Sequence, residues 1–200
     1  MSDEQRRQLQ QQLWNIADTL RGKMNADEFR DYILGFIFYK YLSEKIENFA
    51  DKELSEDGLK FAELKEDNAD DAEIVEAVRE ATVKTLGYFL KPSELFKAIA
   101  KKGNNGVSDD EDTNEESKKK NFIHNDLSKI LKNIEQSTLG TESADDFSNL
   151  FEDLDLTSSK LGATEKAKND LVAKILVQKV TYRFTYLHCK RFIKMYGFRF

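Results

Sequence analysis

A run of eleven residues, Tyr32–Leu42, constrains the fold more than any other feature, because nine of its side chains are apolar or aromatic. Asn25, followed by Glu28 three positions later, is a typical helix start, so the run lies inside a helix that extends to about Ala50. A helix that is hydrophobic on nearly every side must be buried, in a core or against partners. Eleven residues cannot span a bilayer, which needs about 20. The sequence therefore predicts the central helix of a soluble, helical assembly with no membrane partner.

A helix is also predicted before this one, from about Asp3 to Leu20, with its apolar residues on one stripe and with Gln and Arg on the other face. Gly22 is a plausible end for it. Downstream, the same periodicity predicts helices near 70–86, 94–101, 122–139, 144–150 and 164–177. One proline and nine glycines in 200 residues also favour helices over a loop-rich β fold. We expect an all-α, mainly bundled fold, with room for a minor extended segment near 87–91 or at the C-terminal end.

Two segments depart from the helical pattern. Residues 103–120 contain one aliphatic side chain, Val107, so we expect a flexible loop inside a helical domain spanning 1–178. Residues 179–200 form a basic aromatic tail with six Lys or Arg, no acid and seven aromatic residues. Two origins stay open for this tail. It is either arbitrary sequence at the end of a truncated or frame-shifted product, or a genuine basic aromatic peptide.

Charge limits how this chain could meet nucleic acid. The whole chain has a net charge of −6, and residues 1–178 hold 25 basic and 37 acidic residues. Such an acidic body cannot bind a phosphate backbone over its whole surface, so local basic positions would have to do it. Arg21, Lys23 and Asn25 surround the turn between the first two helices and are our candidates for DNA or subunit contacts. The alternative is that they form a solvated turn.

Aromatic residues supply the candidate scaffold or interface anchors, which are Trp14, Phe36 and Tyr39. Trp14 is either a core anchor between the first two helices or an anchor in a protein interface. The aromatic side chains of the central helix point in several directions, and the sequence does not apportion them between its own helices and another subunit. Gly35 costs roughly 1 kcal/mol relative to Ala inside a helix. It marks either the close approach of another helix or a tolerated defect.

No catalytic or metal-binding constellation is evident in the sequence. His124 and His188 lie 64 residues apart without metal-ligand spacing, and His124 is predicted to be an exposed residue at a helix start. Cys189 follows His188, but adjacency in sequence does not place a base on a thiol. We therefore predict no catalytic, cofactor-binding or metal-binding residues in this chain. A single cysteine and the lack of an apolar segment after Met1 predict a cytoplasmic protein.

Several blocks of residues resemble the opening of the modification subunit of type I restriction–modification systems. The specific block comprises Leu13-Trp14, Ala17-Asp18, Leu20-Arg21-Gly22, Met24, Glu28-Phe29, Ile33-Leu34 and Tyr41-Leu42-Ser43. Looser similarity follows in Leu86-Gly87-Tyr88-Phe89 before Pro92, in Phe147, in Leu150 to Leu156 and in Lys160-Leu161-Gly162. The resemblance runs from about Gln8 to about Val177.

This resemblance implies a helical domain that precedes an adenine-N6 DNA methyltransferase domain. The expected partners are a specificity subunit, a second modification subunit and double-stranded DNA. Such a methyltransferase needs a Gly-rich turn for S-adenosylmethionine and an Asn/Asp-Pro-Pro-aromatic motif for the flipped base. This chain has no Gly-x-Gly and only one proline, Pro92. We therefore expect S-adenosylmethionine to bind only a catalytic domain missing from this chain, and the chain to be inactive as a methylase alone.

The function expected from the sequence is thus non-catalytic, with the domain mediating subunit assembly and closure around DNA. The alternative is a self-contained helical interaction protein that binds nucleic acid through its basic C-terminal tail, by charge and aromatic stacking. Deletion of 179–200 would separate the two, because only the alternative would lose nucleic-acid binding.

Overall fold

The computed structural model describes residues 22–105 and 122–177 continuously, together with five isolated helical positions nearer the start: Glu4, Arg7, Gln11, Asn15 and Asp18. These five are all exposed and lie three or four residues apart, as expected for the polar face of the predicted first helix. Trp14 and Arg21, residues 106–121 and the tail 179–200 lie outside the described residues.

The described ranges fold into α-helices joined by turns and two 3₁₀ turns, with no strand among them. The elements in order are α2 (Ala26–Glu53), η1 (Phe61–Glu63), α3 (Ala69–Leu86), η2 (Pro92–Glu94), α4 (Phe96–Asn105), α5 (Ile123–Ser137), α6 (Ala144–Phe147) and α7 (Glu165–Val177). This confirms the all-α prediction. Residues 87–91, where an extended segment was considered, are irregular, and α4 continues to Asn105, past the expected start of the loop at Gly103.

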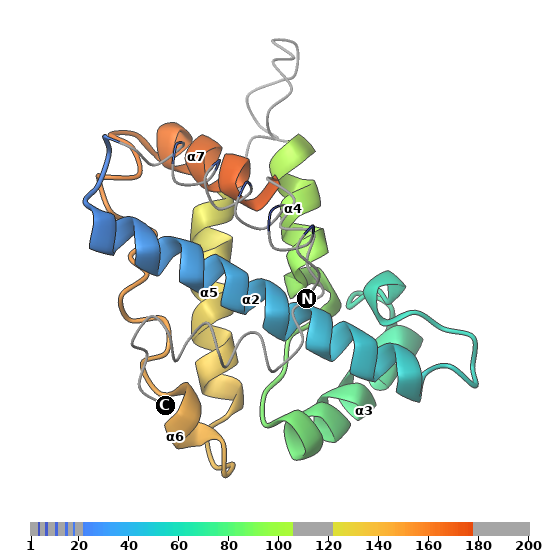
Figure 1. Cartoon of the computed structure of the whole chain (residues 1–200). Coiled ribbons are helices and arrows are strands. Elements are labelled where there is room, and N and C mark those ends of the chain that lie inside the picture. Colours follow the sequence, from blue (N-terminus) through green and yellow to red (C-terminus); the bar gives the residue numbers. More distant parts are fainter. Residues whose placement is uncertain are drawn as a thin grey trace.

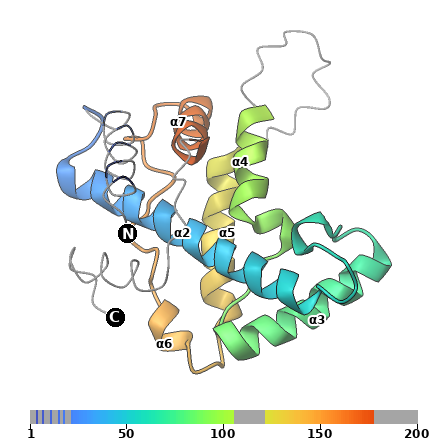
Figure 2. The same cartoon turned by 45° about the vertical axis from the view of Figure 1, so that its right-hand side comes forward.

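Helix α2 is the axis around which the other elements are arranged (Figure 1). It crosses in front of α5, while α3 packs near its C-terminal end. In Figure 2, α4 and α5 lie side by side, and α7 packs against both of them at the end of the molecule where α2 begins. From Asp31 to Glu47 no residue of α2 is exposed. The prediction of a buried central helix is therefore confirmed.

Local sequence explains where the long helices begin and end. Asn25 caps α2, because its side chain accepts a hydrogen bond from the Glu28 amide (2.9 Å) and the Glu28 carboxylate accepts one from the Asn25 amide (3.1 Å). Asn68 caps α3 by accepting hydrogen bonds from the amides of the next helical turn. Helix α3 ends at Gly87, whose φ of 84° suits glycine.

Amphipathic pattern explains the packing of α5. Its inward residues recur at helical spacing, and they are Ile123, His124, Leu127, Ile130, Leu131 and Ile134. The opposite face is exposed and polar. Together with α2, the buried faces of α3, α4, α5 and α7 form one continuous apolar core.

Candidate functional site

The start of α2 holds two of the three positions that the sequence proposed for DNA or subunit contact, and the third, Arg21, lies outside the described residues. Lys23 and Asn25 are exposed there. The Asn25 side chain already accepts the capping hydrogen bond, and Glu28 forms an ion pair with Lys160. This ion pair, with the backbone hydrogen bond from Asn25, holds the pKa of the Glu28 carboxyl below its usual range. The start of α2 is thus an ordered surface region with charges of both signs. Among the described residues there, Lys23 is the basic side chain that forms no ion pair.

One side of α2 is covered by residues 148–161, here called the strap. The Tyr32 hydroxyl donates a hydrogen bond to the backbone carbonyl of Asp155. One turn further along α2, Leu154 lies very close to Gly35. A Cβ atom added to Gly35 would lie 2.7 Å from Leu154 Cδ2. Of the two alternatives left open for Gly35, close approach therefore applies, but the neighbour is an irregular segment rather than another helix.

The strap continues along the same face of α2. The ring of Phe38 lies 6.1 Å from that of Phe151, centroid to centroid. The Phe151 amide donates to a Glu135 carboxylate oxygen on α5 (3.3 Å), so the strap fills the space between the two helices. Positions 32, 35 and 38 recur every three residues and share a helix face. The sequence contained both partners of this contact, but nothing in it paired them.

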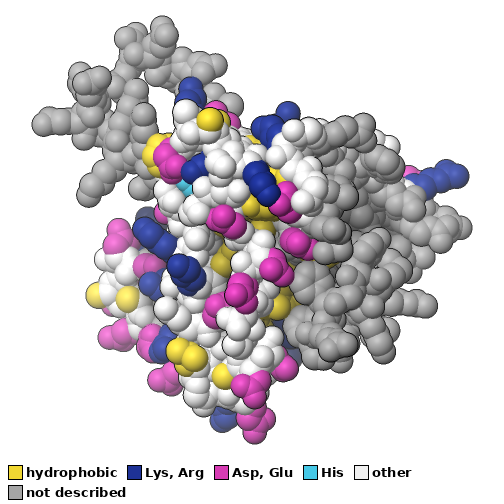
Figure 3. All heavy atoms as spheres, turned by 90° about the vertical axis from the view of Figure 1, so that its left-hand side faces the viewer, with side chains coloured by type: hydrophobic (Ala, Val, Ile, Leu, Met, Phe, Trp, Pro, Cys, Tyr) yellow, Lys and Arg dark blue, Asp and Glu magenta, His cyan; other side chains and the backbone are white. Residues whose placement is uncertain are grey.

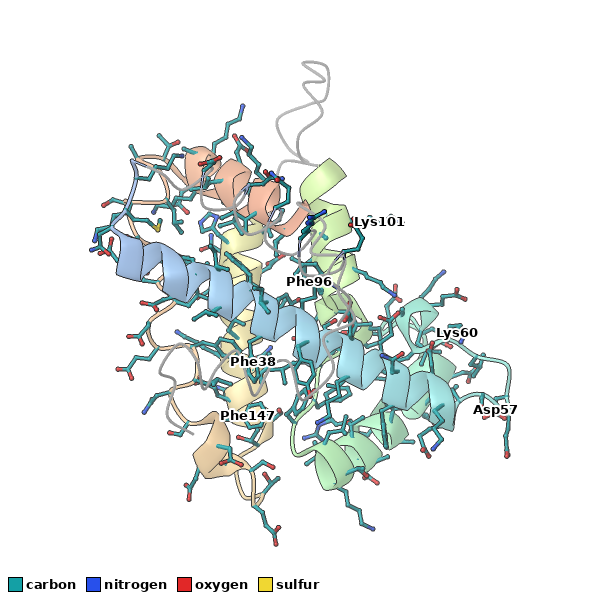
Figure 4. The ribbon with its side chains drawn as sticks, viewed as in Figure 1. Phe38, Asp57, Lys60, Phe96, Lys101 and Phe147 are labelled. Atoms are coloured by element: carbon teal, nitrogen blue, oxygen red, sulfur yellow. The ribbon has the colours of Figure 1, made fainter. Side chains whose placement is uncertain are left out.

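The other side of α2 is joined to η2 and α4 by polar groups. The Tyr39 hydroxyl donates to the Glu94 carbonyl (2.6 Å), and the Phe96 amide donates to the Ser43 hydroxyl (2.8 Å). Phe96 and Phe38 lie on opposite sides of the α2 ribbon in Figure 4. Burial raises the pKa of the Tyr39 phenol, so it stays a hydrogen-bond donor at all physiological pH values.

Phe36 and Tyr39, the candidate anchors on α2, are buried in the core. Tyr39 is fully buried and Phe36 is 5% exposed, so both pack into this domain's own core. Tyr88, in the irregular segment after α3, also contacts α2, because its hydroxyl donates a hydrogen bond to the Leu42 carbonyl (3.0 Å). Together with the strap, these contacts hold α2 on two sides.

His124 is a correction to the sequence analysis. It was predicted to be exposed at a helix start, but it is only 1% exposed. Its Nε2 atom lies 2.8 Å from Glu165 Oε2, while Nδ1 has no hydrogen-bond partner. The pKa of the Glu165 carboxyl is lowered, first by Lys168 (2.9 Å) and then by His124. The exposed-start prediction failed because α7 covers the first turn of α5.

A cleft of about 520 Å³ lies where α3 meets the turn at 141–143. Its charged lining residues have both signs, and they are Arg79, Lys84, Glu80 and Glu142. None of the residues proposed from the sequence lines it. On the side of the molecule where α2 begins, acidic and basic side chains are likewise interspersed (Figure 3).

Neither a metal-ligand cluster nor a membrane-spanning helix is found within the described ranges. No group of three or more His, Cys, Asp or Glu side chains there could hold a metal ion. No helix of this part of the chain has both the length and the apolar character to cross a bilayer. The described ranges form a helical body with one apolar core and polar surfaces.

Comparisons with known proteins show which family and which proteins this chain is similar to. The family model described as the HsdM N-terminal domain matches residues 9–180. The methylase subunit of the type I restriction enzyme MpnII from Mycoplasma pneumoniae is 30% identical over 175 residues, which are 86% of this chain and 30% of that protein. The crystal structure of a type I restriction-modification system methyltransferase subunit from Streptococcus thermophilus matches with a TM-score of 0.62 and 30% identity, covering 86% of this chain and 33% of that one. The chain thus spans about a third of the length of these relatives.

Proposed function

Because the chain belongs to the HsdM N-terminal domain family, we propose that it is a non-catalytic assembly domain of a type I modification subunit. In this proposal it binds the specificity subunit and a second modification subunit, and it helps to close the cytoplasmic complex around double-stranded DNA. The observation that carries the proposal is the wrapping of α2, none of whose residues from Asp31 to Glu47 is exposed within this chain.

A helix held in this way supports a docking role for a physical reason. Binding is strongest when the surface presented to a partner is already ordered, because less conformational entropy is lost on association. The strap fixes one side of α2, and Glu94 and Phe96 fix the other. The capped start of α2 is therefore held in a defined place, and Lys23 lies next to it on the surface.

The direct test is to mix the full chain with purified specificity subunit at micromolar concentration and to follow both by gel filtration. We expect a common peak at a larger size than either protein alone. Separate migration of the two proteins would contradict the assembly proposal.

A charge-reversal pair locates the contact. Lys23→Glu changes the exposed side chain next to the start of α2, whereas Lys52→Glu makes the same charge change at the far end of that helix. If the start of α2 meets the specificity subunit, only Lys23→Glu weakens the complex. Equal weakening by both variants would point to a general charge effect and against this contact.

A further inference from the structure

Helices α4 and α5 form an antiparallel pair that presents one common outer face. Lys102, near the end of α4, lies 3.7 Å from Asp126 at the start of α5. At the opposite end of the pair, the Asn133 side chain of α5 donates to a Glu94 carboxylate oxygen just before α4 (2.8 Å). The two helices are side by side in both ribbon views (Figures 1 and 2).

This outer face is rich in lysine although the chain as a whole is acidic. Helix α4 contains three lysines and no acid. Helix α5 adds two lysines on its exposed side, so five exposed lysines occupy the pair, and they are Lys97, Lys101, Lys102, Lys129 and Lys132. Figure 4 labels Lys101 on α4. In a chain with a net charge of −6, these lysines are a local excess of positive charge, because no acid of α4 or α5 is exposed.

Acids near this face are already engaged. Glu47 of α2 forms an ion pair with Lys97 (2.7 Å), and Asp126 lies beside Lys102. Glu94 accepts hydrogen bonds from Asn133 and from the Lys91 amide. Lys101, Lys129 and Lys132 form no ion pair with any described residue, so they are the uncompensated charges of the face. We call these three the lysine triad.

The triad suits a polyanion better than a protein surface. Protein interfaces are built around buried apolar and aromatic residues, with charged residues depleted at their centre. The one large hydrophobic residue that is strongly exposed in the described ranges, Leu139, lies beyond the end of α5. Gln136, one turn beyond Lys132 on α5, is exposed and adds a hydrogen-bonding group of the kind that contacts phosphate and sugar.

We propose that the outer face of α4 and α5 binds the phosphate backbone of double-stranded DNA through the lysine triad, without reading its sequence. The proposal rests on the assembly function above and moves the expected DNA contact away from the start of α2. Lysine acts there as a point charge that neutralises a phosphate and releases a counterion. No base-specific geometry is required, and the fixed spacing of the two helices sets the line along which the backbone lies.

The experiment compares two triple variants of the full chain. Lys101→Gln, Lys129→Gln and Lys132→Gln together remove the triad while keeping good helix formers. The matched control is Lys52→Gln, Lys65→Gln and Lys84→Gln, which removes three exposed lysines without ion pairs elsewhere in the described ranges. The probe is a fluorescently labelled DNA duplex of arbitrary sequence, followed by anisotropy over a range of salt concentrations.

We expect the triad variant to bind the duplex about tenfold or more weakly at about 0.1 M salt, and its salt dependence to become shallower by about one unit per lost phosphate contact. The control should stay close to wild type. Equal loss in both triple variants, or no duplex binding by the wild type at low salt, would overturn the proposal.

Gel filtration of the same variants with the specificity subunit separates this proposal from the assembly function. If the triad variant assembles normally and binds DNA normally, the DNA face is wrong and the assembly proposal stands. If the wild type itself fails to assemble, the assembly proposal fails whatever happens with DNA. If the triad variant loses assembly but keeps its affinity for duplex, the face is a protein docking surface and the DNA proposal is overturned.

Discussion

Helices α2 and α5 both contribute buried residues to the core, but they differ in how much of their surface is apolar. From Tyr32 to Leu42, helix α2 is apolar on nearly every side, and it is covered on one side by the strap and on another by η2 and α4. Helix α5 is amphipathic, with a continuous inward stripe and an exposed polar face. The distribution of apolar residues around each helix therefore indicates its role. A helix that is apolar on nearly every side is buried and supports the core, whereas an amphipathic helix leaves a surface free for a partner.

The largest expected difference between the two helices is in the cost of truncation. Ile46→Ala removes a fully buried side chain of α2, and we expect a loss of about 2–5 kcal/mol in the free energy of unfolding. Lys132→Ala on the exposed face of α5 should change it by less than about 0.5 kcal/mol. Urea unfolding of both variants measures this contrast. Similar values for the two would mean that α2 is not the central support.

The next contrast uses two hydrogen bonds to the same residue. Tyr39→Phe removes the buried bond to the Glu94 carbonyl, and we expect a loss of about 1–3 kcal/mol because an acceptor is left unpaired. Asn133→Ala removes the exposed bond to the Glu94 side chain, where water can replace it, so its effect should be within about 0.5 kcal/mol. The order would be reversed if η2 were anchored mainly by α5.

Alkaline pH tests the strap side of α2. Burial raises the pKa of Tyr32 to about 12, whereas a tyrosine in the unfolded chain titrates near 10. The stabilising contribution is therefore complete below about pH 10 and declines as pH rises toward 12. Between about pH 9 and about pH 11 we expect wild type to lose about 1 kcal/mol more than Tyr32→Phe. Parallel pH profiles for the two proteins would show that the phenol is not buried beneath the strap.

The smallest effect concerns Gly35 beneath Leu154. Gly35→Ala alone should destabilise by about 1 kcal/mol, because the new methyl group displaces the Leu154 side chain. In a Leu154→Ala background the space is free, and the higher helix propensity of alanine should stabilise by up to about 1 kcal/mol. A double-mutant cycle in urea unfolding gives the coupling between the two positions. Additive effects would contradict direct contact between the strap and α2.

Much of the local structure could be predicted from the sequence. The buried character of α2 followed from its apolar run Tyr32–Leu42. Its start followed from the spacing of Asn25 and Glu28, which form the expected capping box. The amphipathic stripe of α5 and the acidic first turn of α3 were also predictable. These features depend on neighbours within a few turns, so periodicity and capping residues contain the necessary information.

The candidate site was harder to predict from the sequence. The sequence directed attention to Arg21, Lys23 and Asn25, of which Arg21 lies outside the described residues and Asn25 is occupied as a helix cap. The lysine triad was missed because Lys101 and Lys129 are 28 positions apart in the sequence, and their helices become neighbours only through packing. His124 was misjudged for the same reason, since burial by α7 is not a local property.

The sequence by itself determined that this chain forms helices, which of them must be buried, and where α2 begins, because those outcomes depend on short-range spacing and on the cost of exposing apolar surface. Only the tertiary structure decided which segments lie together. Leu154 could meet Gly35, and α4 could align with α5, only after the chain had closed long loops around α2. Contacts of that kind depend on the packing of the whole core and leave no periodic trace in the sequence.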